Sequence, residues 1–391
     1  MFSSSTITVL CVAISAFSSL SVSAAPSARR SNSQAALAQS ALRDILNRGA
    51  PILGYDDGCS RSSRTCDWMA KVADNTKLVH MNLPGTHDSA TWNYTQATQD
   101  SLVRYTGTIP AAEYFQCQGH SFFQMLNGGI RVFDLRFALN PGNDTIGFYH
   151  SQALLSPTTS IEDVFFGFYS WLDKHPTEAV LISLQYESGT GTENTEALQV
   201  HMYNLLNSDL AKKYWVQANG TLNTLGEARG KLTLLQRFDW SLLPDTLTDR
   251  FGLHLDPEDW TDNSPNISLT YNEDTGATAY IEDYYEIGLP IGAGAAENIQ
   301  WKYNATTVHI AEAASSLHPD SLYISFASSE HTSDLPPETP RIMALGNGSD
   351  IPGVNQKLLP WLQERKGQRF GIVMLDFFDS IPGVVEAVIG L

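Results

Sequence analysis

The sequence predicts an α/β fold of the (β/α)8 barrel type, on three observations. Apolar runs with the length of buried strands alternate with segments of helical periodicity, which is the pattern of a parallel sheet. There are eight such runs, the number of strands that closes a barrel, although the barrel need not be regular. The chain has 391 residues without an internal repeat, so it fits one large domain of this kind after loss of a leader. The expected strands begin at Leu78 and continue at residues 129–137, 146–150, 179–187, 231–238, 278–286, 322–327 and 370–377.

Helical patterns lie before and between these strands. The clearest begins at Ser160, where Ser-x-x-Asp to Asp163 predicts a capping box, and it ends before Pro176. Two long connections, residues 239–277 and 328–368, are rich in Pro, Gly, Asp and Asn and are expected to form loops near the functional site. The other expected helices lie within residues 31–48, 66–73, 193–206 and 356–365.

Residues 1–25 predict a secretory signal peptide. They are apolar, rich in small residues and end in an Ala-x-Ala-like cleavage site at Val22-Ser23-Ala24-Ala25, although no Lys or Arg precedes the apolar run. A membrane anchor is the alternative, but the run is short and serines interrupt it. Residues 26–65 are then expected to form an N-terminal arm with a cysteine loop, and residues 66–391 the barrel.

Sequons and cysteines agree with export. Cys59 and Cys66 flank a polar loop and are placed to form a small disulfide, which leaves Cys117 as a buried, unpaired thiol. Several Asn-x-Ser/Thr sequons in one chain that has a leader indicate a secreted eukaryotic glycoprotein. The six sequons begin at Asn93, Asn143, Asn219, Asn266, Asn304 and Asn347.

The charge of the chain excludes one class of function. The formal net charge is −18, and a nucleic-acid partner requires a basic face that this chain does not offer. An acidic secreted enzyme, expected to be a monomer, is the simplest interpretation.

Three segments place polar residues at the ends of predicted strands, where α/β folds carry their chemistry. The first is Leu-Val-His-Met-Asn-Leu-Pro-Gly-Thr-His-Asp, in which His87 and Asp88 follow a turn at Pro84-Gly85. The second, Gly-Ile-Arg-Val-Phe-Asp-Leu-Arg-Phe, puts Asp134 and Arg136 on one side of a strand. The third, Ile-Gly-Phe-Tyr-His, ends at His150.

In this order the three segments resemble the X-domain of phosphatidylinositol-specific phospholipase C, particularly the single-domain bacterial type. That family has a Pro-Gly-Thr-His-Asp turn, a Gly-Ile-Arg-x-Phe-Asp-x-Arg strand and a strand that ends in histidine. The resemblance extends with gaps from about Trp68 to the C-terminus. It implies a TIM-type barrel that cleaves a phosphodiester bond of phosphatidylinositol-like lipids at a membrane surface.

The residues themselves can perform this chemistry. Phosphodiester cleavage needs a base for the nucleophile, an acid for the leaving oxygen and a positive charge on the phosphate. Two histidines can fill the first two roles near neutral pH, and an arginine fork matches phosphate oxygens. The resemblance assigns the base to His87, the acid to His150 and the phosphate contact to Arg136.

The carboxylate partners also come from the resemblance. Asp88 would orient His150, Asp376 on the last strand would pair with His87, and Asp134 would support Arg136. Asp379 is the competing partner for His87.

The resemblance further implies that no metal or other cofactor is needed. Animal phospholipases of this class place a calcium-binding carboxylate where this chain has Arg136, and an asparagine where it has Asp88. The metal-independent bacterial relatives have the residues found here. A cation site at Asp134 and Glu187 is the alternative.

Substrate contacts carry over unevenly. The family's inositol-binding Arg and Asp-x-Tyr match Arg237, Asp283 and Tyr285, but its lysine is replaced by Gln185. That replacement keeps open a second hypothesis, a phosphodiesterase for another phospholipid or a glycerophosphodiester. A third hypothesis is a non-catalytic secreted binding protein on the same scaffold.

Overall fold

A computed structural model describes residues 27–142, 144–286, 292–348 and 350–391. The predicted signal peptide, residues 1–25, and the sequon at Asn143 lie outside the described residues, so both stay predictions. The chain divides into two units, Met1–Asp44 and Ile45–Leu391. Helix α1 (Ser27–Leu53) covers the helix predicted at residues 31–48 and extends beyond it in both directions. Among the described residues no helix is long and apolar enough to cross a membrane.

The second unit is built on a sheet whose core is eight parallel strands, which confirms the predicted fold class. The spatial order is β7-β6-β5-β2-β1-β11-β10-β9, so the last strand pairs with the first as in a barrel. An additional strand, β8 (Ile267–Asn272), is antiparallel to β9 and forms one end of the sheet, while β7 forms the other. Within the described segments β7 and β8 do not pair, so the barrel has one open seam. The parallel strands are β1 (Leu83–Thr86), β2 (Val132–Leu139), β5 (Val180–Tyr186), β6 (Leu232–Arg237), β7 (Leu253–His254), β9 (Ala277–Glu282), β10 (Leu322–Phe326) and β11 (Ile372–Leu375).

The strand predicted at residues 146–150 is present, but its predicted place in the barrel was wrong. Residues 146–150 form β3 (Ile146–His150), which is antiparallel to β2 and continues into β4 (Ala153–Leu154) instead of joining the barrel. The chain between β2 and β3 is too short for the crossover that a parallel strand requires. The missing barrel strand is β7, which lies inside the connection 239–277 that was predicted to be a loop.

The first strand also starts later than predicted. Leu78–His80 is a 3-10 helix, η2, and the strand β1 contains the Pro84-Gly85 pair that was expected to end it. Pro84 has no backbone N–H, but its carbonyl still pairs with the neighbouring segment by accepting from the Arg131 amide at 2.9 Å, so the strand tolerates a proline at this position. A Cβ on Gly85 would collide with Met374 and Val132 of the two flanking strands, so only glycine fits there.

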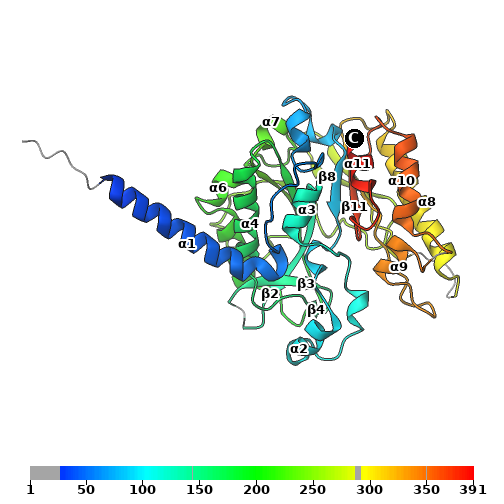
Figure 1. Cartoon of the computed structure of the whole chain (residues 1–391), viewed down its shortest axis with the longest axis horizontal. Coiled ribbons are helices and arrows are strands. Elements are labelled where there is room, and N and C mark those ends of the chain that lie inside the picture. The colour runs from blue at the N-terminus through cyan, green and yellow to red at the C-terminus, as the bar shows by residue number, and fades with distance from the viewer. Residues whose placement is uncertain (1–26, 143, 287–291, 349) are drawn as a thin grey trace, which may run out of the picture. The chain divides into compact units, whose positions relative to one another are not determined.

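Helices cover the outside of the barrel. α4 begins at Ser160 with the predicted capping box to Asp163, and Figure 1 shows α4 on one side of the strands and α8 and α10 on the other. The connection 328–368, predicted as a loop apart from a helix at 356–365, contains α9 and α10. The helices after α1 are η1 (Trp68–Lys71), η3 (Ser89–Thr91), α2 (Gln96–Thr106), η4 (Ala112–Tyr114), α3 (Phe122–Gly128), α4 (Ile161–Lys174), α5 (Glu196–Leu206), α6 (Ala211–Tyr214), α7 (Leu225–Ala228), α8 (Ala295–Ala313), α9 (Pro340–Leu345), α10 (Val354–Glu364) and α11 (Val384–Ile389).

The hydrophobic core has two layers, which follow from the alternation of side chains along each strand. Phe133 and Leu135 of β2 face the helix layer, where they meet Phe122 and Phe168. Val132 belongs to the other cluster, which fills the barrel interior. The inward positions of neighbouring strands in that cluster are Leu83, Leu181, Leu235, Ile281, Ile324 and Met374.

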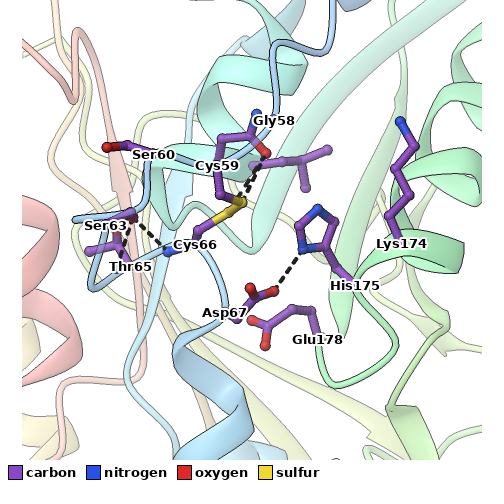
Figure 2. The surroundings of a disulfide bond; sticks show 12 residues. Gly58, Cys59, Ser60, Ser63, Thr65, Cys66, Asp67, Lys174, His175 and Glu178 are labelled. Carbon is purple, nitrogen blue, oxygen red and sulfur yellow. Dashed lines mark hydrogen bonds and ion pairs between the residues drawn. A yellow bond between two sulfur atoms is a disulfide. The ribbon is translucent and has the colours of Figure 1, made fainter.

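Cys59 and Cys66 form the predicted disulfide, with 6.0 Å between their Cα atoms. Figure 2 shows this loop beside the C-terminal end of α4, where His175 Nδ1 lies 2.7 Å from a carboxylate oxygen of Asp67. Cys117 is a buried free thiol, also as predicted.

Candidate active site

The site is the last inward-facing layer of the barrel. His87 lies four residues beyond Leu83 of β1, and Arg136 lies four residues beyond Val132 of β2, so both continue the inward alternation. Asp376 follows Met374 of β11 in the same way. Parallel strands bring their carboxyl ends to one rim, and this is why residues distant in sequence meet there.

His87 has partners on both ring nitrogens. Nδ1 lies 2.9 Å from Asp376 Oδ1, and Nε2 accepts from Arg136 Nη2 at 3.0 Å. Because Nε2 is an acceptor, the ring is neutral with its hydrogen on Nδ1. Asp379 pairs with His120 instead, at 2.9 Å, so the structure brings Asp376 and not Asp379 to His87.

His150 is presented by the hairpin of β3 and β4. Its Nδ1 donates to the Phe115 carbonyl at 2.9 Å, and its Nε2 lies 3.2 Å from Asp88 Oδ2. Because His150 Nδ1 already carries a hydrogen, a neutral ring would present Nε2 as an acceptor toward the carboxylate of Asp88, which is also an acceptor. This contact requires a further proton on one of the two groups. We infer that a further proton belongs to the pair of His150 and Asp88, whose 3.2 Å contact does not have the geometry of a hydrogen bond. The rings of His87 and His150 are 6.2 Å apart, and Asp88 Oδ2 is 3.2 Å from both Nε2 atoms.

Carboxylates surround the guanidinium of Arg136. Its Nε lies 2.9 Å from Asp88 Oδ1 and 3.5 Å from Asp134 Oδ2, and its Nη1 lies 3.8 Å from Glu187 Oε2. Asp134 is fully buried and also pairs with Arg237 Nη1 at 3.2 Å. Asp134 thus fixes two arginines, one more than the sequence analysis expected.

Three residues next to the site adopt left-handed backbone conformations. Asp88, Ser151 and Phe377 have φ values of 40°, 51° and 44°. They directly follow His87, His150 and Asp376 in the sequence. Such conformations cost about 1–3 kcal/mol each for residues other than glycine and cluster at functional sites.

Each of these three conformations is held by a hydrogen bond from its own amide. The Asp88 amide donates to Asp134 Oδ2 at 3.3 Å, and the Ser151 amide donates to Glu187 Oε1 at 2.8 Å. The Phe377 amide donates to the Cys117 carbonyl at 2.9 Å. The backbone at the rim is therefore fixed by the same carboxylates that surround Arg136 and by the segment that contains Cys117.

Burial shifts the protonation of these groups. It lowers the pKa of His87 well below its usual value, and the Arg136 guanidinium lowers it further. Burial also lowers the pKa of His150, again with a contribution from Arg136. Burial raises the pKa of Asp88 to about 7, with Arg136 opposing the shift and Asp134 adding to it. His87 is thus suited to accept a proton, and Asp88 holds one up to neutral pH.

A cavity of about 430 Å³ opens above this layer. Asp88 and Asp134 lie beneath its floor, whereas the two histidines and Arg136 are exposed to it. The other predicted residues that line it are Gln185, Arg237, Asp283, Tyr285 and Asp376.

The structure adds partners to the predicted substrate contacts. Arg237 stacks on the ring of Trp260 at 3.7 Å, and Trp260 Nε1 donates to Asp283 Oδ2 at 2.8 Å. The Tyr285 hydroxyl donates to Asp262 at 3.0 Å. Trp260 and Asp262 come from the long 239–277 connection, which was expected near the site but without assigned residues.

The segment of residues 115–118 is the main part that sequence reasoning missed. Phe115 contributes its backbone carbonyl to His150. Gln118 is fully buried, and its Nε2 donates to the carbonyls of His87 and Leu375 at 2.7 and 2.8 Å. A backbone carbonyl leaves no signal in a sequence, and a lone glutamine carries no pattern.

The arrangement bears on the metal question. Asp134 and Glu187, the residues of the alternative cation site, both lie beside the Arg136 guanidinium. His87, Asp88 and Cys117 come within ligand distance of one another, but burial raises the pKa of Cys117 and keeps it a neutral thiol, a poor ligand. Metal independence therefore stays a prediction. The position of the Arg136 guanidinium beside Asp134 and Glu187 fits this prediction.

Comparison with known proteins gives relatives but no matching family model. The chain is 29% identical over 177 residues to a 1-phosphatidylinositol phosphodiesterase of Listeria monocytogenes, which covers 44% of this chain and 49% of that protein. It is 22% identical over 280 residues to the enzyme of that name from Staphylococcus aureus, covering 70% and 77%. PI-PLC X domain-containing protein 1 of Homo sapiens is 24% identical over 196 residues, covering 45% and 58%. The chain thus spans about half the length of two of these relatives.

Solved structures share the fold. A variant of phosphatidylinositol-specific phospholipase C from Staphylococcus aureus aligns with a TM-score of 0.62 at 19% identity, over 84% of this chain and 98% of that one. The Listeria monocytogenes enzyme aligns with a TM-score of 0.57 at 21% identity, over 83% and 97%.

The fold and the site together define a barrel of the (β/α)8 class with two histidines and two arginines at its carboxyl rim. The predicted resemblance to the phosphatidylinositol-specific phospholipase C X-domain family is confirmed, because the relatives in sequence and the neighbours in structure bear that name.

Proposed function

We propose that this chain is a phosphodiesterase of the phospholipase C type that cleaves phosphatidylinositol-like lipids without a metal. The observation that carries this proposal is the rim geometry. A neutral His87 backed by Asp376 faces His150 across the cavity, and Arg136 and Asp88 lie between them.

The first half of the reaction uses His87. Its unprotonated Nε2 would remove the proton of the inositol 2-hydroxyl, and Asp376 at 2.9 Å from Nδ1 would stabilise the cation that forms. The hydroxyl oxygen would then attack phosphorus within the same molecule, which gives the reaction the advantage of proximity. Arg136 would stabilise the charge that develops on the phosphate oxygens.

The second half uses the proton shared by His150 and Asp88. His150 would donate it to the diacylglycerol oxygen as the bond to phosphorus breaks, giving diacylglycerol and a cyclic inositol phosphate. The Phe115 carbonyl, 2.9 Å from Nδ1, holds the ring so that Nε2 faces Asp88. Asp134 would serve this step through Arg136.

Head-group recognition would use Arg237, Asp283 and Tyr285, with Gln185 in the place of the family's lysine. One observation favours a second candidate function, cleavage of another phospholipid or a glycerophosphodiester. Gln185 Oε1 is buried without a hydrogen-bond partner among the described residues, so this side chain is free to contact a different head group.

A substrate panel with product analysis tests both candidates. Phosphatidylinositol, phosphatidylcholine, phosphatidylglycerol and glycerophosphoinositol are incubated with the wild type and with the His87→Ala and His150→Ala variants. A cyclic inositol phosphate that disappears in both variants is the expected result. Release of a different head group favours the second candidate. No cleavage of any of these substrates by the wild type would favour the non-catalytic binding protein.

We also propose that the chain is exported after cleavage of residues 1–25 and acts as a monomer on phospholipid surfaces. The disulfide between Cys59 and Cys66 supports an oxidising compartment. The division into an arm of residues 26–65 and a barrel of residues 66–391 stays part of this proposal. Fractionation of expressing cells, with sequencing of the mature N-terminus, tests it.

A further inference from the structure

Helix α8 presents apolar residues to solvent, contrary to the usual pattern of a surface helix. Trp301 and Val308 are 47% and 60% exposed, whereas Ile299, Lys302 and Ile310 on the other side of the helix are buried. Trp301 and Val308 are seven residues apart, two helical turns on one face. Figure 1 shows α8 at the periphery of the second unit, outside the strands.

This apolar stripe forms one wall of an open groove of about 340 Å³. Pro265 and Asn266, at the start of β8, and Tyr284, beyond the end of β9, complete the groove. It shares no lining residue with the cavity of the candidate active site. An exposed apolar surface of this kind needs a cover in a secreted protein.

Two sequon asparagines stand in the wall of the groove. Asn304 lies on α8 between Trp301 and Val308, and Asn266 lies opposite. Both are exposed. Asn304 Oδ1 accepts from Gln300 Nε2 at 2.8 Å, while Asn304 Nδ2, the atom that a glycan would modify, donates to no group in the part of the chain that the structure describes.

The remaining described sequons differ from these two. Asn93 is partly buried, and its Nδ2 donates to the Pro51 carbonyl at 2.6 Å, so a sugar on this atom would break a packed contact. Asn219 and Asn347 are exposed but do not line this groove.

We propose that Asn304 and Asn266 carry N-linked glycans, and that the first sugars on Asn304 lie in the groove against Trp301 and Val308. A pyranose ring has an apolar C–H face that can pack on an indole ring, and its hydroxyls then face water. The glycan thus converts an apolar stripe into a polar surface. The occupant is the chain's own modification, attached at the groove, and the inference does not depend on phosphodiesterase activity.

The test uses the full chain secreted from a eukaryotic host. Peptide mapping by mass spectrometry measures occupancy, which is expected at Asn304 and Asn266 and not at Asn93. Asn304→Gln is then compared with Asn219→Gln, which removes a sequon away from the groove. Binding of a fluorescent hydrophobic dye is expected to rise severalfold for Asn304→Gln alone, and adding Trp301→Ser is expected to return it to the wild-type level.

Evidence that a different partner occupies the groove would contradict the proposal. A glycosylated wild type that dimerises, or that binds phosphatidylcholine vesicles, and loses this property with Trp301→Ser would overturn the proposal. So would an unmodified Asn304, or equal dye binding by the two glutamine variants. If Asn304→Gln is not secreted, enzymatic removal of glycans from the folded wild type gives the same comparison.

Discussion

Arg131 directly precedes β2 and Arg136 lies within it, five residues further on, and their surroundings are opposite in kind. Arg131 is fully buried and matched: Nε and Nη2 bond Glu178 at 3.0 and 2.6 Å, and Nη1 donates to the Leu126 and Ile130 carbonyls at 2.8 Å. Its Nη2 also donates to the Cys66 carbonyl, which ties the disulfide loop to the barrel.

Arg136 instead lies in a cluster of polar groups that are not matched by hydrogen bonds, and its own Nε is one of the unmatched atoms among the described residues. Buried oxygens of Asp88, Gln185, Glu187 and Asp376 near it lack hydrogen-bond partners among the described residues, while no atom of Arg131 or Glu178 does. Unmatched polar groups are costly, and they persist where a ligand completes them. The comparison teaches that the end of the barrel at Arg131 is matched internally, whereas the end at Arg136 keeps a donor and several oxygens that the phosphate and hydroxyl groups of the proposed substrate could complete.

Arg131→Met should destabilise the end of the barrel that contains Arg131, and we expect this substitution to have the largest effect. Removing one partner of a buried ion pair leaves Glu178 unpaired, which typically costs about 3–5 kcal/mol. The midpoint of urea unfolding measures this loss. The variant's remaining folded fraction should keep the wild-type kcat/KM, and a selective loss of activity without loss of stability would contradict the division of roles.

Arg136→Lys should lower activity at the end of the barrel that contains Arg136, with little change in the free energy of unfolding. The lysine keeps the charge but loses the fork, and the expected loss in kcat/KM corresponds to about 3–4 kcal/mol, in the range of one lost transition-state contact. Phosphodiester cleavage by the wild type should also be unchanged by EDTA and by added calcium. Activity that is abolished by the chelator and restored by calcium would move the site to Asp134 and Glu187.

Gln118→Leu should sharpen the comparison, because Gln118 joins the rim without touching the cavity. The variant leaves the buried carbonyl of His87 without its Gln118 partner, at a cost of about 1–3 kcal/mol, while the Leu375 carbonyl keeps its bond from the His87 amide. We expect kcat to fall and KM to stay near the wild-type value, since the change misplaces His87 relative to Asp376. Leu126→Ala, which lies in the core near Arg131, serves as the control that lowers stability alone.

The pH dependence of kcat/KM is the smallest of the effects that we expect. Asp88 holds the shared proton up to its pKa of about 7, and the acid must be protonated to act, so kcat/KM should fall as the pH rises above that value. The pKa of His87 is lowered, so the base stays neutral and activity persists below pH 6.5, the ordinary value. Asp88→Asn should remove the alkaline fall. A rate that rises through pH 8 would contradict the assignment of acid and base.

The sequence was sufficient for the barrel and for the residues that meet at its rim. His87, Arg136, His150 and Asp376 are recognisable because each ends an apolar strand within a motif of fixed order. The local hairpin β3 was mistaken for a barrel strand, because an apolar run does not state whether its neighbour is parallel or antiparallel. The true strand, β7, has two residues and gives no periodicity to detect.

The parts of the site that sequence analysis missed share one property. The Phe115 carbonyl, the Gln118 amide and the Trp260 indole act through contacts made only when distant segments fold together. Nothing in the spacing of these residues distinguishes them from ordinary packing residues. The Cys59–Cys66 pair could be predicted because a short loop between two cysteines constrains its own closure.

The open seam between β7 and β8 divides the rim by rigidity. Three of the groups proposed for bond making and breaking, His87, Arg136 and Asp376, belong to or follow β1, β2 and β11, which form one uninterrupted hydrogen-bonded arc, whereas His150 comes from the β3–β4 hairpin. Those proposed for the head group follow β6 and β9, each one strand away from an end of the sheet. Strand ends that lack a neighbour open most readily. We therefore expect substitutions at the proposed head-group contacts to change substrate preference more readily than they change the reaction itself.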